Sequence, residues 1–137
     1  MQGQSIVAHF RDGRMLKGVS LDVRPDKPVC HVKPETGEVV EVRLHTVKAL
    51  FFVKTPGGQP EYQESKAPVD GDQRQVGARK VRIAFEDGEE IVGLMNRYPP
   101  TTPFFFMLPI DPGSNNVRIL VNKSAVKKMS EWAAPKA

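Results

Sequence analysis

Apolar and polar residues alternate with a period of two along much of the chain, a pattern typical of β-strands that bury one face. Ile6, Ala8 and Phe10 alternate with Val7 and His9, and Asp12-Gly13 follows as a tight-turn signal, because glycine accepts a positive φ without steric cost. The first part of the chain predicts five strands, at about residues 6–10, 15–23, 29–33, 40–44 and 47–53.

Two of these predicted strands carry further information. Gly18 interrupts the second strand, and a glycine inside a strand often marks the bend that a small barrel requires. Residues 47–53 are almost entirely apolar, which predicts that the fifth strand is buried on both faces.

The same pattern returns 75 residues later in the chain. Shared Gly and Pro positions indicate shared backbone geometry, so we interpret the chain as an internal duplication. Phe10, Asp12, Gly13 and Gly18 recur as Phe85, Asp87, Gly88 and Gly93; Pro25, Pro28 and Pro34 recur as Pro100, Pro103 and Pro109; Val42 and Arg43 recur as Val117 and Arg118.

The second copy predicts strands at about residues 81–85, 91–95, 104–108 and 117–121. Ser124 then fits the N-cap of a short C-terminal helix, because Ala125, Met129 and Trp132 follow at helical spacing. The predicted fold class is therefore all-β, with two tandem five-stranded small barrels and that helix. We expect the first barrel over residues 1–53, a Gly-, Pro- and Gln-rich linker over 54–78, and the second barrel with the helix over 79–137.

Composition sets bounds on the partners and the compartment. The net charge of +4, from 20 basic and 16 acidic residues, permits an anionic partner without requiring one. The single cysteine, Cys30, excludes an intrachain disulfide and is compatible with a reducing compartment. Neither a signal peptide nor an apolar run of the roughly 20 residues that a transmembrane helix needs is visible. We expect a cytoplasmic protein that does not insert into membranes.

The sequence offers little support for catalysis. His9, His31 and His45 fall on separate predicted strands or their ends, without the spacing of metal ligands. The chain also contains neither a nucleophile-elbow motif nor a glycine-rich phosphate loop. We therefore predict a non-enzymatic protein with no metal and no cofactor.

Two surfaces are candidates for binding. The apolar run at 104–108 follows Tyr98 and favours a protein interface or self-association, with Tyr98, Phe104, Phe105 and Phe106 as candidate contacts. The alternative is RNA or DNA binding through basic loop and strand residues, with Arg24, Lys27, Arg43, Arg97 and Arg118 as candidate phosphate contacts. An arginine beside a strand also often covers apolar surface while staying in water, which is the non-functional interpretation of these residues.

Residues 6–34 resemble the first half of a bacterial or eukaryotic Sm-like barrel, through Val7, the Asp12-Gly13-Arg14 turn and Gly18. Residues 81–109 are similar, with Asp87-Gly88 and Gly93. The resemblance implies five-stranded bent sheets of the SH3-like kind, ring oligomers and RNA held by loop residues. The family's loop Asp and Asn and its later Arg-Gly motif are missing here, which weakens the implied RNA site.

Two further resemblances bear on the layout and the ligand. The paired arrangement is similar to that of bacterial proteins built from two small barrels. A cyclic-dinucleotide-binding barrel of the PilZ type is a further alternative, but Arg74 and Arg79 have the wrong spacing for it.

Overall fold

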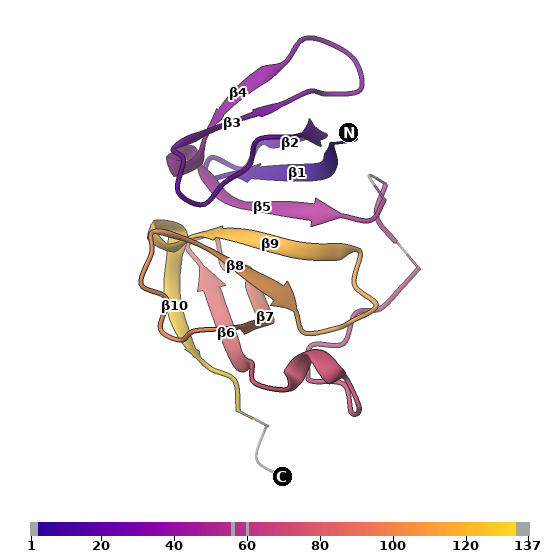
Figure 1. Cartoon of the computed structure of the whole chain (residues 1–137), viewed down its shortest axis with the longest axis vertical. Helices are drawn as coiled ribbons and strands as arrows, with labels where there is room; N and C mark the ends of the chain where they lie inside the picture. Colours follow the sequence, from indigo (N-terminus) through magenta and orange to yellow (C-terminus); the bar gives the residue numbers. More distant parts are fainter. Residues whose placement is uncertain (1–2, 56, 60, 134–137) are drawn as a thin grey trace.

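The computed structural model describes residues 3–55, 57–59 and 61–133, and its regular elements are β-strands and three-residue 3-10 helices (Figure 1). The N-terminal half contains β1 (Gln4–Phe10), β2 (Met15–Ser20), β3 (Val29–Val32), β4 (Val40–Arg43), η1 (Leu44–Thr46) and β5 (Val47–Val53). The C-terminal half contains β6 (Arg79–Phe85), β7 (Glu90–Met95), β8 (Phe104–Pro109), β9 (Asn116–Asn122), η3 (Lys123–Ala125) and β10 (Val126–Glu131), and η2 (Gln73–Gln75) lies between the halves. The all-β prediction is confirmed.

The strands form two sheets. Eight of them make one sheet in the order β10-β6-β7-β8-β9-β5-β1-β2, and β3 pairs with β4 in a second sheet. A backbone bridge between Val19 and Lys33 connects β2 to β3. The larger sheet has two ends, at β10 and β2, and is therefore open. In Figure 1 the two halves lie one above the other and meet where β5 runs beside β9.

The strand pairing of the first half recurs in the second. Ser5 pairs with Val19 across β1 and β2, and Lys80 pairs with Leu94 across β6 and β7, each 75 residues later. β1 also pairs with β5 as β6 pairs with β10, and the register shifts beside Phe10 in one pair and at the matching place in the other. The repeat in the sequence is thus also a repeat of backbone connections.

The offset between the copies changes from 75 to 79 residues after the third strand of each half. The amide of Leu44 donates to the carbonyl of Pro28 at 2.9 Å, and the amide of Lys123 donates to that of Pro103 at 2.9 Å. The second half therefore holds four more residues between β8 and the end of β9. Our pairing of Arg43 with Arg118 is corrected by this insertion: Arg43 ends β4, and its counterpart at the end of β9 is Asn122.

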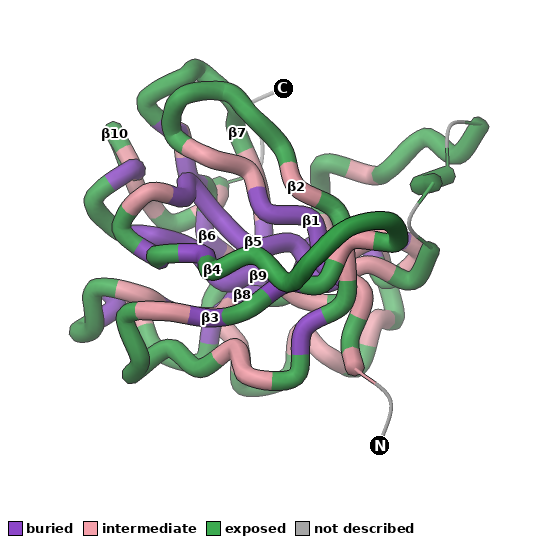
Figure 2. Tube along the Cα trace, turned by 90° about the horizontal axis from the view of Figure 1, so that it is seen from above, coloured by how far each residue is buried: buried purple, intermediate pink, exposed green. Residues whose placement is uncertain are grey.

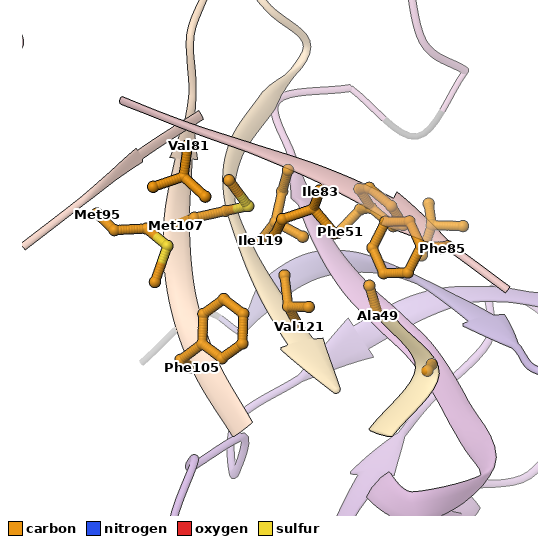
Figure 3. Close-up of a cluster of buried hydrophobic side chains, with 12 residues drawn as sticks. Ala49, Phe51, Val81, Ile83, Phe85, Met95, Phe105, Met107, Ile119 and Val121 are labelled. Carbon is orange, nitrogen blue, oxygen red and sulfur yellow. The ribbon is translucent and has the colours of Figure 1, made fainter. Parts of the chain in front are cut away.

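Two hydrophobic clusters fill the molecule, and β5 contributes to both. Ala49 and Phe51 belong to the cluster of the second half, whereas Leu50 and Phe52 belong to that of the first half. Burial of β5 on both faces is thereby confirmed. Figure 3 shows side chains from β5, β6, β8 and β9 meeting in the second cluster, and Figure 2 shows the buried stretches in the middle of the molecule.

The predicted C-terminal helix is wrong for the residues that the structure describes. Ser124 lies in η3, and the residues after it form β10, which pairs with β6. Met129 packs against the second cluster as part of a strand. Strand pairing with β6 outweighs the helical spacing of these apolar residues. β6 pairs with β7 on one side, and β10 supplies its second neighbour on the other. In the described part of the chain, no helix has the length and apolar character to cross a membrane.

The predicted linker is attached to the second half. Asp111 is buried and lies in the loop that carries the additional residues. Its carboxylate accepts hydrogen bonds from the Tyr62 hydroxyl at 2.8 Å and from the Ser65 amide at 2.7 Å. The Arg74 guanidinium donates to the carbonyl of Ile110 at 3.2 Å. These contacts hold much of the segment between the halves against the β8–β9 loop.

Candidate functional site

A groove of about 680 Å³ lies between the loops of the two halves. One wall is the β2–β3 loop of the first half, and the other is the β7–β8 loop of the second, so the matched loops of the duplication face the same space. Its lining consists of Pro25, Asp26, Lys27, Pro28, Met95, Asn96, Arg97, Pro100, Thr101, Thr102, Pro103, Phe104, Phe105 and Phe106. Its size is within the range of ligand sites in proteins.

Both walls are held by backbone contacts next to the 3-10 helices. The carbonyls of Pro28 and Pro103 accept the amides that begin η1 and η3. The Lys123 ammonium donates to the carbonyl of Pro100 at 3.2 Å. Proline fixes φ, and these anchors fix the ends of the loops, so the walls of the groove are largely formed before a ligand binds.

The floor of the groove is aromatic and comes from β8. Phe105 faces the second cluster and is 7% exposed, whereas Phe104 and Phe106 are partly exposed and pack against the first cluster. Alternation along one strand thus leaves the side chains of Phe104 and Phe106 partly accessible at the groove.

Arg118 supports this floor from β9. Its guanidinium lies 4.3 Å from the ring centroid of Phe52 and 4.5 Å from that of Phe106. It also donates to the Gln4 side-chain oxygen at 2.9 Å. With its guanidinium over both rings, Arg118 makes cation–π contacts that help to fix these aromatic side chains.

The charge of the groove is positive. Asp26 is paired with Arg24 at 2.8 Å. Lys27 and Arg97 are exposed, and neither forms an ion pair among the residues that the structure describes. The rim therefore presents two cations whose charge is not neutralised by a neighbouring carboxylate.

The five basic residues predicted for nucleic acid do not form one surface. Lys27 and Arg97 line the groove, and Arg24 lies beside it in an ion pair. Arg43 pairs with Glu41 at 3.5 Å on β4. Arg118 is stacked on the rings described above. The structure thus brings two of the five together.

Of the four predicted protein contacts, Phe104, Phe105 and Phe106 line the groove, and Tyr98 lies on the far side of its wall. The Tyr98 hydroxyl donates to the carbonyl of Met129 at 3.3 Å, and its ring packs against the second cluster. Tyr98 therefore links the β7–β8 loop to β10. The proline walls were missed as site residues, although their recurrence at matched positions was a signal that could have found them.

The described residues outside the groove offer no metal centre, since no three His, Cys, Asp or Glu side chains gather there in a group that could hold an ion. Cys30 is fully buried in the first cluster. Burial raises the pKa of its thiol to about 11, so the thiol stays protonated near neutral pH.

Residues 2–133 match the family of unknown function DUF6982. The chain belongs to this family. No curated protein and no solved structure matches it. Because DUF6982 spans nearly the whole chain, the family covers both halves and the segment between them, and thus both walls of the groove.

Proposed function

We propose that this DUF6982 protein is a non-enzymatic binding module that holds an extended segment of a partner protein in the groove. The observation that supports it is the joint lining of one groove by the matched loops of both halves. A groove made this way exists only when the two halves are joined, which gives the duplication a function beyond stability.

The chemistry of the lining indicates an apolar segment with acidic residues. Proline rings and the partly exposed rings of Phe104 and Phe106 offer apolar surface, and the prolines have no side-chain entropy to lose. Lys27 and Arg97 at the rim favour carboxylates of the partner over ammonium groups. Asn96 and Thr101 can bond to the backbone of an extended peptide, while the Thr102 hydroxyl already donates to the carbonyl of Phe104 at 2.8 Å and can only accept.

Nucleic acid is the competing ligand, since exposed cations beside aromatic rings also bind single strands. The dispersal of Arg24, Arg43 and Arg118 into contacts of their own favours the peptide. We therefore make a single-stranded RNA one arm of the test.

The test measures fluorescence anisotropy of three labelled probes at low and high salt. The first probe is a short peptide of Leu and Pro alternating with Glu, the second carries Lys in place of Glu, and the third is an oligouridine. We expect the acidic peptide to bind tightest. A Thr101→Trp variant should block it sterically, and Lys27→Glu with Arg97→Glu should weaken it about tenfold or more.

The matched control is Lys17→Glu with Lys33→Glu, which makes the same charge change at exposed lysines outside the groove. This control should bind the acidic peptide nearly as well as the unchanged protein. Equal binding of all three probes would overturn the proposal. Tight oligouridine binding that weakens steeply with salt would favour the nucleic-acid alternative.

We further propose that each half is a small barrel of the Sm-like or SH3-like kind. In the second half β10, β6, β7, β8 and β9 are neighbours in that order, and β5-β1-β2 with the bridged β3-β4 pair repeats the order in the first half. A short 3-10 helix precedes the last strand in both halves. Comparison with an experimental structure of the chain tests this assignment, and halves that fail to superimpose would contradict it.

A further inference from the structure

A smaller pocket, of about 260 Å³, adjoins the groove. Pro100 lines both spaces, so the β7–β8 loop separates them. The pocket takes one wall from Tyr98, Pro99 and Pro100 of this loop, and the other from residues of η3 and β10. A segment that leaves the groove past Pro100 therefore meets this pocket next.

Three lysines give the pocket a positive charge. Lys123, Lys127 and Lys128 line it, and all three are exposed. None of them forms an ion pair within the part of the chain that the structure describes. The Lys123 ammonium donates to the carbonyl of Pro100 at 3.2 Å, which holds it beside the loop without neutralising its charge. The pocket therefore favours an anionic group.

The two neighbouring lysines of β10 line one pocket at an irregularity of that strand. In the pairing of β10 with β6, Lys127 is skipped between Val126 and Lys128, so it is the extra residue of a β-bulge. In the pairing of β5 with β1, Lys48 is skipped at the matching place. Lys48 and Lys127 are therefore equivalent residues of the two halves.

The first half shows what such a lysine binds. Lys48 lies on β5, which pairs with β9 in the seam between the halves. Its ammonium donates to Asp87 at 2.8 Å and also to Glu89. Both carboxylates belong to one turn of the other half, and a single residue, Gly88, separates them. The chain thus holds two equivalent lysines, one of which is already paired with two carboxylates.

We propose that the pocket around Lys127 and Lys128 binds a pair of carboxylates spaced like Asp87 and Glu89. The pair belongs to the partner segment that fills the groove, so this proposal rests on the proposed function. It places an acidic end of that segment beyond Pro100 and adds a second charged contact to those of the groove rim.

The charge pattern favours a different chain over a second copy as the occupant. The equivalent turn of the first half, Asp12-Gly13-Arg14, has an arginine in place of the second carboxylate. That arginine pairs with Asp12 at 2.7 Å. This turn of a second copy would therefore bring a cation toward the lysines of the pocket, which repel it.

The first test extends the acidic peptide that is expected to bind the groove. Fluorescence anisotropy compares this peptide with versions that carry Asp-Gly-Glu at the N-terminal or the C-terminal end, or Asn-Gly-Gln at the same ends. We expect one of the two acidic extensions to tighten binding about tenfold at low salt and less at high salt. The amide extensions should not tighten it.

Charge removal in the pocket should abolish this gain. Lys127→Gln with Lys128→Gln should bind the extended and unextended peptides equally, and the unextended peptide as well as the unchanged protein does. Lys123 is kept because it holds Pro100. The matched control is Lys17→Gln with Lys33→Gln, which removes two exposed lysines outside both spaces and should keep the gain. Circular dichroism should show an unchanged fold for both double variants.

The second test examines the pocket without the groove. A short Gly-Asp-Gly-Glu-Gly peptide should shift the amide signals of Lys127 and Lys128 in NMR spectra, and Gly-Asn-Gly-Gln-Gly should not. These shifts in a protein that fails to bind the groove peptide would contradict the proposed function and support the pocket. Absence of the shifts, or a groove peptide that binds equally with every extension, would overturn the pocket proposal.

Other occupants give different results. Self-association that Lys127→Gln with Lys128→Gln abolishes would identify a second copy as the occupant. Oligouridine that binds through these lysines more tightly than the extended acidic peptide would identify a nucleic acid. Either result would overturn the proposal.

Discussion

The Nζ atom of Lys48 on β5 lies 2.8 Å from Oδ2 of Asp87, in the β6–β7 turn of the other half. The same ammonium donates to Glu89 and lies 5.0 Å from the ring centroid of Phe85. The Lys48 side chain is 8% exposed, whereas the two carboxylates are about half exposed. A buried cation of the first half is thus neutralised by a turn of the second.

The difference in exposure between the buried ammonium and the half-exposed carboxylates predicts which variants lose more stability. Asp87→Asn with Glu89→Gln leaves a buried ammonium without a counter-charge and should lower the free energy of unfolding by about 3 kcal/mol. Lys48→Met leaves two carboxylates that water can solvate, and it should cost less. Urea unfolding measures both, with Lys17→Met as an exposed control expected within about 0.5 kcal/mol. An equal or larger loss for Lys48→Met would contradict this account.

The same contact predicts a dependence on pH. The hydrogen bond from Lys48 holds the pKa of Asp87 below its ordinary value. A carboxylate whose pKa is lower in the folded state contributes stability above its unfolded pKa of about 3.9 and loses it as pH falls through the folded value. Stability should therefore decline below about pH 4, and part of this decline should vanish in Asp87→Asn. Thermal unfolding at about pH 6 and pH 3 measures the difference, and identical declines would contradict the prediction.

Gly18 and Gly93 make the same close approach in the two halves. A Cβ added at Gly18 would lie 2.5 Å from the carbonyl oxygen of Lys33, and one at Gly93 would lie 2.5 Å from that of Leu108. Because these are backbone atoms, Gly18→Ala and Gly93→Ala should each lower stability by about 2 kcal/mol in urea unfolding. Gly57→Ala meets nothing within 4 Å and is the matched control. A neutral result at either glycine would show that the strands can separate at little cost.

Much of the fold was predictable because its signals are local. Alternation and the Asp-Gly turns each depend on a few neighbouring residues, and the recurrence of Gly18 as Gly93 shows that the same local pattern occurs twice. The counterpart of Arg43 was not predictable, since a four-residue insertion in the β8–β9 loop changes the offset without altering the pattern before it. The C-terminal strand was missed because its apolar spacing also fits a helix, and pairing with β6 decides between them.

The groove was only partly predictable. Lys27 and Arg97 were found from sequence because each lies in a loop next to a predicted strand. The meeting of the two proline loops depends on the β5–β9 seam, a long-range pairing that no local pattern encodes. The ion pair of Lys48 with Asp87 was missed for the same reason.

Asp111 predicts how the segment between the halves is held. Hydrogen bonds from Ser65, Gly113 and Tyr62 outweigh burial and keep the pKa of the Asp111 carboxyl below its ordinary value. Asp111→Ala removes the acceptor of all three, so hydrogen exchange should accelerate in residues 61–66 while β6 stays protected. Tyr62→Phe removes one of the donors and should produce a smaller effect. Unchanged exchange in Asp111→Ala would show that other contacts hold the segment.

The contacts of Arg118 predict that arginine and lysine at this position differ in how far they stabilise the fold. Lysine in its place keeps the charge but lacks the planar group that stacks on Phe52 and Phe106, so Arg118→Lys should lower the free energy of unfolding by about 1 kcal/mol. The ring protons of Phe106 should also shift in NMR spectra, because the guanidinium no longer covers that ring. Gln4→Ala is the control, since it removes the hydrogen bond to Arg118 and leaves the stacking in place. If Gln4→Ala cost as much as Arg118→Lys, the hydrogen bond rather than the stacking would position this arginine.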